Sequence, residues 1–427
     1  MSADLVSGNA IIGQSGGPTA VINQSLVGVV EGLRLGLHAA GKVKSIYGMR
    51  HGVKGFVKGD LVDLTTMHQD RLDRLAATPS AGLGSTRDKP DKAYCERVLE
   101  ACRKHDVRYF FYIGGNDSSD TCRIISEMAA STGWDMRCFH VPKTVDNDLM
   151  ENDHTPGFPS AARFVALAAM SDFLDNVSLP GIKINVVMGR HAGFLTAAAA
   201  LARRHDRTLS PLSDAHSTDG PQLIYLPEVA FDLERFVADV DTIYSKRGRC
   251  HIVVSEGIQD KDHVAIGSKL IKGGQVDAHG NVQLSGSGAL GDLLSDLLKE
   301  KLTPAGGKPP RVRADTFGYV QRCWPDSSPV DRHEARGTGR FAARLALMGE
   351  RSGSVAIERT GSGSICWKGV YDGTPYASEY RKVDLSAVAA KTRHMPAEFI
   401  RGTSDVSTKF IEYCLPLVGE LPVFERL

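Results

Sequence analysis

Lysine and aspartate side chains are placed where two neighbouring strands are expected to end. Residues 109–113 form an apolar run typical of a buried parallel strand, and two glycines follow it. A second run at 137–141 leads into a segment that carries Lys143, Asp146 and Asp148. Parallel strands deliver such residues to one edge of a sheet. A cation and two carboxylates there suit phosphate chemistry, in which phosphate charge is held while a hydroxyl loses its proton.

The segment after the two glycines predicts a helix start. Residues 116–119, Asn-Asp-Ser-Ser, are all types that cap helix N-termini, where free N–H groups bind anions. Asp117 is unusual, because a loop that holds nucleotide phosphates favours a small residue at this place. Its carboxylate is expected to repel the inner phosphate of a nucleotide and to leave room for a shorter donor. The alternative is an ordinary acidic residue that the helix dipole stabilises.

The Asp-Asn-Asp sequence at 146–148 allows two arrangements. On extended backbone Asp146 and Asp148 share a face, whereas on a turn they diverge. Taken alone, the tripeptide is typical of an Asx turn before a helix. The nearby Lys143 favours a catalytic interpretation.

Composition limits the class of protein. The 427 residues allow two domains or one large two-lobed unit, and 51 basic against 50 acidic residues give no sign of a nucleic-acid or anionic-membrane partner. No apolar run is long enough for a membrane span and no secretory leader is evident, so we expect a cytoplasmic protein. The eight cysteines are scattered without a C-x-x-C pair, which favours reduced thiols.

Strand-like and helix-like segments alternate along most of the chain. This alternation predicts an α/β protein with mostly parallel, doubly wound sheets and ligands at the carboxyl ends of strands. The predicted strands are 10–13, 44–47, 109–113, 137–141, 182–187, 223–226, 251–255, 311–316 and 354–358. The predicted helices include 23–37, 92–105, 160–176, an alanine-rich helix after 193, 231–247, 289–302 and 339–349. Residues 257–287 are expected to form a surface hairpin.

Several weaker signals accompany these elements. Residues 14–20 contain a glycine turn between a strand and a helix, which by itself is typical of any βα turn. Isolated arginines are usually solvated, so Arg87, Arg190, Arg313 and Arg322 gain meaning only from a shared site.

Taken together, these motifs resemble the 6-phosphofructokinase family, in consistent order from residue 11 to about 358. Residues 14–17 look like the first glycine loop of that family, 114–118 like its second, and 142–148 like its catalytic segment. The sugar-phosphate elements are matched by 188–190, 227–228, Arg313 and 318–322. The resemblance implies two similar doubly wound lobes with the active site in the cleft between them.

Two positions separate the subfamilies. ATP-dependent members usually carry glycine where this chain has Asp117 and Lys143, whereas members that use pyrophosphate carry aspartate and lysine. The resemblance therefore implies reversible phosphoryl transfer between pyrophosphate and fructose 6-phosphate, with Mg2+ as cofactor. An ATP-dependent enzyme, a non-catalytic regulatory subunit, and a kinase for another sugar phosphate such as sedoheptulose 7-phosphate remain as alternatives.

The resemblance also implies roles for individual residues. Asp146 would take the proton from the sugar 1-hydroxyl, Lys143 would neutralise the transferred phosphoryl group, and Asp117 would select the donor. The residues that would cradle pyrophosphate are Gly16, Arg87 and Ser118. The residues that would hold the sugar phosphate are Thr144, Asp148, Met188, Gly189, Arg190, Glu228, Arg313, Tyr319 and Arg322.

The chain departs from the family pattern at three places. Asn116 stands where many members have an aspartate associated with the metal, so Asn116, Asp117 or pyrophosphate itself would hold Mg2+. Tyr319 replaces a histidine of many ATP-dependent members. Gly181 stands where they place an arginine donated across a subunit interface, and Lys183 is the substitute that we consider.

We expect residues 1–155 with about 323–360 to form the phosphoryl-donor lobe. Residues 156–322 would form the sugar-phosphate lobe, and 361–427 a C-terminal extension that packs on both. Because the family borrows a basic group from a neighbouring subunit, the resemblance also implies a homodimer or homotetramer.

Overall fold

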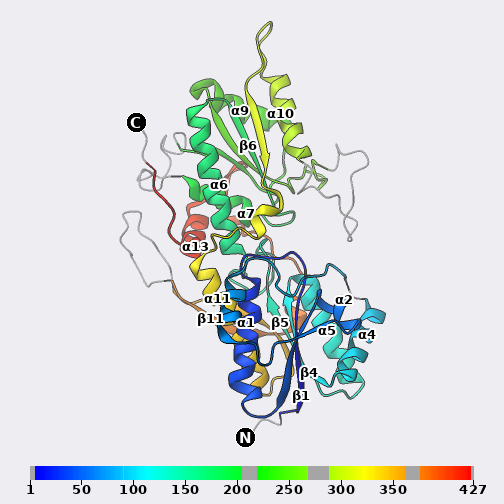
Figure 1. Cartoon of the computed structure of the whole chain (residues 1–427). Coiled ribbons are helices and arrows are strands. Elements are labelled where there is room, and N and C mark those ends of the chain that lie inside the picture. Colours follow the sequence, from blue (N-terminus) through cyan, green and yellow to red (C-terminus); the bar gives the residue numbers. More distant parts are fainter. Residues whose placement is uncertain (1–4, 90, 204–218, 268–287, 362–375, 425–427) are drawn as a thin grey trace. The chain divides into compact units, whose positions relative to one another are not determined.

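The chain divides into two compact units (Figure 1). The computed structural model describes residues 5–89, 91–203, 219–267, 288–361 and 376–424. Unit 1 holds the described residues up to 160, with 322–361 and 377–393. Unit 2 holds the described residues from 161 to 321, with 376 and 394–424. Across the described ranges, no helix has the length and apolar character needed to cross a membrane.

Unit 1 is built on a seven-stranded sheet in the order β11-β10-β5-β4-β1-β2-β3. Its strands are β1 (Gly8–Gln14), β2 (Val43–Met49), β3 (Leu61–Asp63), β4 (Val107–Gly114), β5 (Arg137–Pro142), β10 (Ser352–Arg359) and β11 (Ser378–Val383). The five central strands run parallel, and the edge strands β3 and β11 are antiparallel to their neighbours. The mostly parallel α/β architecture predicted from the alternation is thereby confirmed.

Helices cover both faces of this sheet (Figure 1). The helices of unit 1 are α1 (Ile22–Leu33), α2 (Gly52–Val57), α3 (Gln69–Ala77), α4 (Lys92–Lys104), α5 (Asn116–Ser131), α11 (Pro329–Leu347) and α12 (Leu385–Val388). Because side chains alternate along a strand, the odd-numbered residues of 109–113 in β4 pack with α1 and α11, and the even-numbered ones with α4 and α5.

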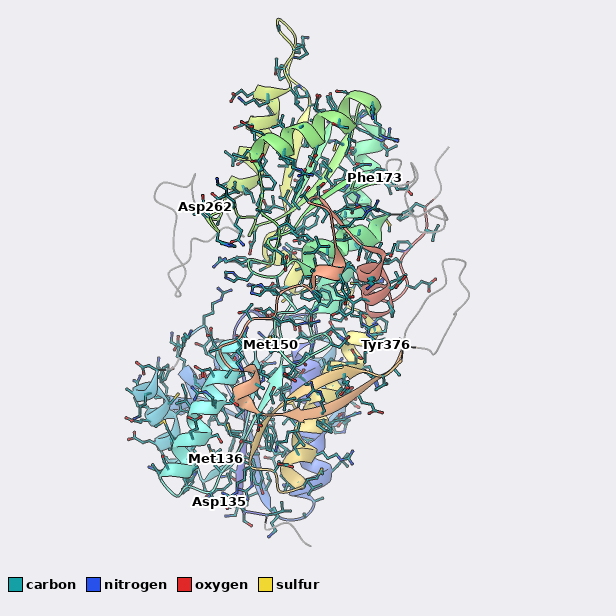
Figure 2. The ribbon with its side chains drawn as sticks, turned by 180° about the vertical axis from the view of Figure 1, so that it is seen from behind. Asp135, Met136, Met150, Phe173, Asp262 and Tyr376 are labelled. Atoms are coloured by element: carbon teal, nitrogen blue, oxygen red, sulfur yellow. The ribbon has the colours of Figure 1, made fainter. Side chains whose placement is uncertain are left out.

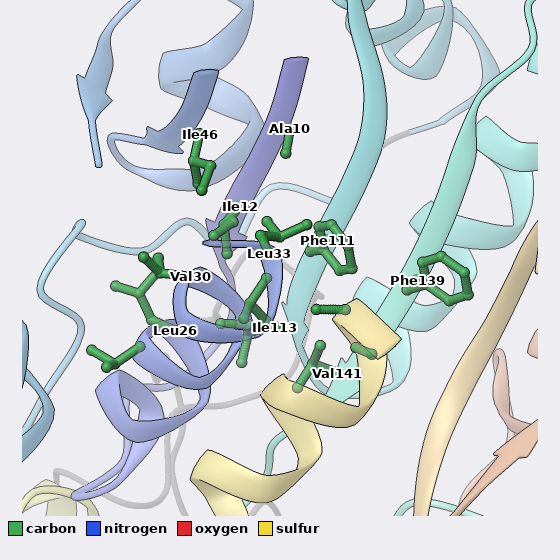
Figure 3. Packing of buried hydrophobic residues seen from close by; sticks show 14 of the residues in the cluster. Ala10, Ile12, Leu26, Val30, Leu33, Ile46, Phe111, Ile113, Phe139 and Val141 are labelled. Atoms are coloured by element: carbon green, nitrogen blue, oxygen red, sulfur yellow. The ribbon is translucent and has the colours of Figure 1, made fainter. Parts of the chain in front are cut away.

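The core beneath α1 shows how helical spacing meets strand spacing. Leu26, Val30 and Leu33 follow one another at intervals of four and three residues, so they share one face of α1. That face packs on the strand residues Ile12 and Ile113, and all five side chains are fully buried (Figure 3). This packing fixes the positions of β1 and β4, and hence of the loops that follow them.

Unit 2 has a four-stranded, fully parallel sheet in the order β7-β8-β6-β9. Its strands are β6 (Ile182–Val187), β7 (Leu223–Tyr225), β8 (Cys250–Ser255) and β9 (Val312–Thr316). Its helices are α6 (Phe158–Ser178, which begins in unit 1), α7 (Phe194–Ala197), α9 (Leu233–Arg247), α10 (Ala289–Lys301) and α13 (Thr408–Val418). Short 3-10 turns at Ala198–Ala202, Gly318–Arg322 and Ala397–Phe399 and the small pair β12 (Ile400–Arg401) and β13 (Asp405–Val406) complete it.

Some elements differ from the sequence predictions. The expected alanine-rich helix is only four residues of α7 before the backbone tightens into the 3-10 turn Ala198–Ala202. The expected helix at 23–37 ends as α1 at Leu33 and continues as a π-helical segment, Arg34–His38. Gln259 and Ala265 form an antiparallel bridge within the expected hairpin, but 268–287 lie outside the described residues. The seven described cysteines are free thiols.

Candidate active site

Three loops of unit 1 meet at the carboxyl edge of its sheet. They follow β1, β4 and β5, which are adjacent strands. The N–H of Ser15 donates to the carbonyl of Ile113 at 2.9 Å, and the N–H of Lys143 donates to that of Gly114 at 2.9 Å. In Figure 2, Met136, just before β5, lies at the opposite end of unit 1 from Met150, which follows the Lys143 loop. The sheet therefore brings the glycine loops and the Lys143 segment together.

Lys143 is a buried cation at the first glycine loop. Its Nζ donates to the carbonyl oxygen of Gly17 at 2.7 Å, and the side chain is only 3 % exposed. Gly16 has φ +76, and a Cβ there would lie 3.1 Å from the lysine Nζ, so a larger residue would crowd the ammonium group. Burial lowers the pKa of Lys143 to about 7, and the positive charges of Arg322 and Arg87 act in the same direction. An anion placed beside this group would restore its charge.

The Gly16 peptide is itself occupied by protein contacts. Its N–H donates to the carbonyl of Thr86 at 2.9 Å, and its own carbonyl accepts from Ser85 Oγ at 2.6 Å. Gly16 therefore contributes space for Lys143 and no free N–H group. Arg87 follows this contact and is exposed; it lines a basic pocket with His51, Lys54 and Lys58.

The second glycine loop ends in α5, but not with the side-chain cap that the sequence predicts. The N-cap position is Gly115, without a side-chain capping bond, because the helix already begins at Asn116. The N–H groups of Ser118 and Ser119 donate to the Gly115 carbonyl at 3.1 Å. Ser118 is buried with its Oγ only 1.9 Å from where a Cβ on Gly114 would lie, so glycine is required there.

Asp117 stands exposed on the first turn of α5. Its Oδ1 lies 3.1 Å from Lys89 Nζ, and the two side chains are 47 % and 62 % exposed. An ion pair with this much exposure is worth little stability. It nevertheless places a lysine beside the carboxylate that we expect to select the donor.

The Asp146–Asp148 segment adopts a turn, which resolves the alternative left open by the sequence. Asn147 between them has φ +60, in the left-handed region. The backbone N–H of Asp146 donates to Thr144 Oγ1 at 3.1 Å, and the Thr144 hydroxyl also bonds to Asp148. Burial raises the pKa of Asp148 to about 6, and the charge of Asp146 adds to this effect.

Asn116 lies beside these carboxyl groups. Its Nδ2 donates to Asp148 Oδ2 over 3.4 Å, whereas its Oδ1 is buried and accepts no hydrogen bond from the described part of the chain. A buried acceptor without a donor fits a cation or a hydroxyl that the protein itself does not supply.

Unit 2 has its own set of polar groups at the carboxyl end of its sheet. Met188 and Gly189 follow β6, and the Gly189 carbonyl accepts from Ser255 Oγ at 2.7 Å. Glu228 follows β7, and its Oε1 accepts from the N–H groups of Gly193 (2.8 Å) and Met395 (3.0 Å). Burial raises the pKa of Glu228. Its buried Oε2 accepts no hydrogen bond within the described ranges, so it is available to a ligand hydroxyl.

Arg313 lies apart from these groups. In the sheet it stands opposite Lys183, near the amino ends of β9 and β6. Its Nη1 is 2.8 Å from Asp175 Oδ2. Met188 and Glu228 lie at the other end of the same sheet, so within one chain Arg313 does not lie beside them. Sequence proximity to residues 318–322 concealed this separation, because a strand advances about 3.3 Å per residue.

Two further basic groups are Lys183, considered above as the group donated across a subunit interface, and Arg322 of the expected sugar-phosphate set. Lys183 is buried and forms ion pairs with Asp172, at 3.2 Å, and with Asp315, so two carboxylates of unit 2 already balance its charge. Arg322 belongs to unit 1, where its Cζ would lie 3.0 Å from a Cβ on Gly17. Tyr319 remains in unit 2, exposed in the turn after β9.

Two contributors were missed by sequence reasoning. Lys89 forms an ion pair with Asp117. It lies two residues after Arg87 in the sequence, and this proximity was the available signal. The backbone of Met395 supports Glu228 from the C-terminal segment, and no motif marks that residue. Backbone contacts of this kind leave no trace in residue types.

Comparisons with known proteins agree with this architecture. The phosphofructokinase family model matches residues 9–346. A pyrophosphate--fructose 6-phosphate 1-phosphotransferase of Rhodospirillum rubrum is 49% identical over 417 residues, which are 97% of this chain and 95% of the relative. One of Halomonas elongata with the same name is 36% identical, over 98% of this chain and 94% of the relative.

The solved structures give the same result. A pyrophosphate-dependent phosphofructokinase from Nitrosospira multiformis superposes with a TM-score of 0.78 at 32% identity, over 98% of this chain and 94% of the other. The chain therefore belongs to the phosphofructokinase family, and the resemblance seen in the sequence is confirmed.

Proposed function

We propose that this protein transfers a phosphoryl group reversibly between pyrophosphate and fructose 6-phosphate, giving fructose 1,6-bisphosphate and phosphate. The observation that carries the proposal is the buried Lys143 amino group at the donor loop, which donates to the Gly17 carbonyl and lies where a side chain on Gly16 would reach it. A short, highly charged donor can bring its phosphates to this group, and Asp117 occupies the turn where a longer donor would extend. The 49% identity to the Rhodospirillum rubrum enzyme supports the same donor.

The deciding experiment compares donors on the purified chain. Fructose 6-phosphate phosphorylation is measured with pyrophosphate and with ATP in parallel, and we expect clear preference for pyrophosphate. Preference for ATP would support the ATP-dependent alternative, and no activity with either would support a regulatory subunit. Sedoheptulose 7-phosphate in the same assay tests the other sugar.

Mg2+ fits this site as a substrate-borne ion. In the described ranges no three His, Cys, Asp or Glu side chains gather closely enough to form a metal cage. Mg2+ usually takes one or two protein oxygens together with substrate phosphates. Asn116, with its unused buried Oδ1, and Asp117 are the residues we propose to hold it. When bound, it would neutralise charge on the phosphates.

Glu228 is the residue that we propose to orient the sugar. Its unused Oε2 is a buried acceptor with a fixed position, because Oε1 is held by two backbone N–H groups. A sugar hydroxyl donates to such an oxygen without displacing another partner. Met188, Gly189 and Arg190, from the turn after β6, complete the proposed set with Thr144, Asp148, Tyr319 and Arg322.

Replacing Asp117 by glycine is expected to admit ATP as a donor. The change removes both the bulk and the charge of a side chain on the first turn of α5, and like charges in contact cost several kcal/mol. We expect ATP affinity, measured by calorimetry, to improve at least about tenfold, which corresponds to ~1.4 kcal/mol.

Matched variants separate charge from bulk. Asp117→Asn removes only the charge, so its gain in ATP affinity over the wild type measures the charge effect alone. Lys89→Ala keeps the Asp117 carboxylate and removes the lysine 3.1 Å from it, so ATP should bind this variant no better than the wild type. Unchanged ATP affinity in Asp117→Gly would show that another feature excludes the nucleotide.

Arg313 is the basic group that we propose a neighbouring subunit donates in a homodimer or homotetramer. Its place at the amino ends of β6 and β9 keeps it away from Met188 and Glu228 of its own chain. We expect Arg313→Ser and Asp146→Asn each to be nearly inactive alone. Mixed oligomers refolded from both should regain part of the activity, because some sites then receive an intact arginine and an intact aspartate. No regain would place Arg313 in the site of its own chain, or outside any site.

A further inference from the structure

A buried histidine of unit 1 lies between two carboxylates. His154 is completely buried; its Nδ1 is 2.8 Å from Asp153 Oδ1 and its Nε2 is 2.6 Å from Glu334 Oε2. An ionised carboxylate only accepts hydrogen bonds, so both contacts are satisfied when both ring nitrogens carry hydrogen. Burial alone would lower the pKa of His154, but the two carboxylates outweigh it and raise this pKa to about 9.

Other charged groups surround this ring from each neighbouring element. Asp153 also receives the guanidinium of Arg359 from β10 at 3.1 Å, and the pKa of Asp153 is lowered to about 2 although burial opposes this. Glu334 Oε1 accepts from Ser378 Oγ of β11 at 2.5 Å. Two further groups feel the Glu334 charge: the pKa of Asp331 on α11 is raised to about 6 and that of Tyr380 on β11 to about 12, in both cases mainly by burial.

The residues that follow His154 form hydrogen bonds to the catalytic segment. Thr155 donates its N–H to Asn147 Oδ1 at 3.0 Å and its hydroxyl to the carbonyl of Thr144 at 2.9 Å. The Thr144 N–H in turn donates to the carbonyl of Pro156 at 3.2 Å. Asn147, fully buried and left-handed, is therefore held in its turn by the residue next to His154.

A second connection runs through the C-terminal segment. Arg393 donates its N–H to the carbonyl of Asp148 at 2.8 Å and its Nη1 to the carbonyl of Asp153 at 2.6 Å. On the other side, Asp331 of α11 accepts from the N–H of Gly157 at 2.9 Å. These bonds thus place residues 153–157 between α11 and the Thr144–Asp148 turn.

We propose that His154 is a positioning residue which, as a buried imidazolium, ties residues 153–157 to α11 and so holds Thr144 and Asp146 in place. This inference rests on the proposed transferase activity. Loss of the ring charge removes one of the two hydrogen bonds that the ring donates, and with it one link between residues 153–157 and the groups around them, which lets the segment shift. The sugar-phosphate groups Arg190 and Glu228 belong to unit 2 and take no part in these bonds.

The ring charge should also appear in the stability. A histidine whose pKa is raised in the folded state contributes stability that is complete below its unfolded pKa, about 6.5. That contribution is lost as pH rises through about 9. We therefore expect the unfolding midpoint to fall over this range in the wild type more than in His154→Gln.

His154→Gln is expected to reduce kcat while leaving the sugar KM within about twofold. A shift of about 1 Å in reacting groups costs on the order of 100-fold, so we expect kcat to fall between about 10- and 100-fold. The fall of wild-type kcat above pH 9 should be absent from the variant. His68→Gln, at an exposed helix start, is the matched control and should match the wild type. An unchanged kcat, or an effect on the sugar KM alone, would overturn the proposal.

Nuclear magnetic resonance of protein with 15N-labelled histidine tests the charge directly. Among the 14 histidines, one ring should keep both nitrogens protonated at pH 8 and titrate near pH 9. This measurement needs only the wild type, so it decides the question even if His154→Gln does not fold. The absence of such a ring would overturn the proposal. Failure of the wild type to use pyrophosphate would instead refute the proposed function, whatever the state of His154.

Discussion

Asp146→Asn is expected to abolish nearly all transfer while leaving both substrates bound. A general base contributes about 100- to 10,000-fold, so we expect kcat to fall about 1,000-fold. The KM values for pyrophosphate and fructose 6-phosphate should stay within about threefold, because an amide of the same shape preserves the contacts but cannot take the hydroxyl proton. Initial rates at saturating substrate provide the measurement.

Asp148→Asn is the matched control for this result. Asp148 is bonded to Thr144 and Asn116, and its pKa is raised to about 6. Its loss should disturb the turn and cost about tenfold, well below a full general-base contribution. If Asp148→Asn were the more damaging change, the base would have to be reassigned to Asp148.

Lys143→Met is expected to be inactive and yet more stable than the wild type. Removing one preorganised charge at a developing anion costs about 100- to 1,000-fold in kcat. The same ammonium group is buried beside Arg322 and Arg87, which depresses its pKa from 10.5 to about 7. A lysine with a depressed pKa destabilises the fold as pH falls from 10.5 to 7, because the unfolded chain binds the proton more tightly. Methionine escapes this cost, so we expect ~1–3 kcal/mol greater stability near pH 7.

The pH dependence distinguishes this account from a simple packing effect. The stability advantage of Lys143→Met should shrink as pH rises from about 7 to above 10.5, because above 10.5 the wild-type lysine is neutral in both states. Lys92→Met, at an exposed position on α4, should show no such pH-dependent gain. Urea unfolding at several pH values measures both. A constant difference across pH would mean that charge burial is not the cause.

The charge of Lys143 in the free protein is expected to be stabilised when the donor binds. The Gly17 carbonyl accepts one hydrogen bond from Lys143, but burial, together with the charges of Arg322 and Arg87, leaves the charge of Lys143 unfavourable without an anion. Pyrophosphate would supply that anion and bind with a gain that includes relief of this repulsion. The buried charge of Lys143 that destabilises the free protein thus strengthens binding of the donor.

The sequence alone was sufficient for the chemistry and for most elements. Period-2 and period-3.6 patterns placed residues 182–187 in a strand with the observed bounds of β6, and residues 137–141 one residue short of β5. The glycines and the Lys-Thr-Val-Asp-Asn-Asp segment identified the edge of the sheet, because both follow segments with the pattern of buried parallel strands. Local patterns of this kind depend on backbone geometry that each segment largely determines for itself.

Only the tertiary structure decided which groups stand together. It showed that Arg313 lies at the amino end of its sheet and that Lys183 forms ion pairs inside unit 2. The spacing of residues in the sequence reveals neither fact. It also placed His154 between Asp153 and Glu334, residues one and 180 positions away. Burial, pKa and hydrogen-bond partners arise from packing between segments that are distant in the sequence. The sequence therefore identified the candidate groups, whereas the fold determined their charge and their neighbours.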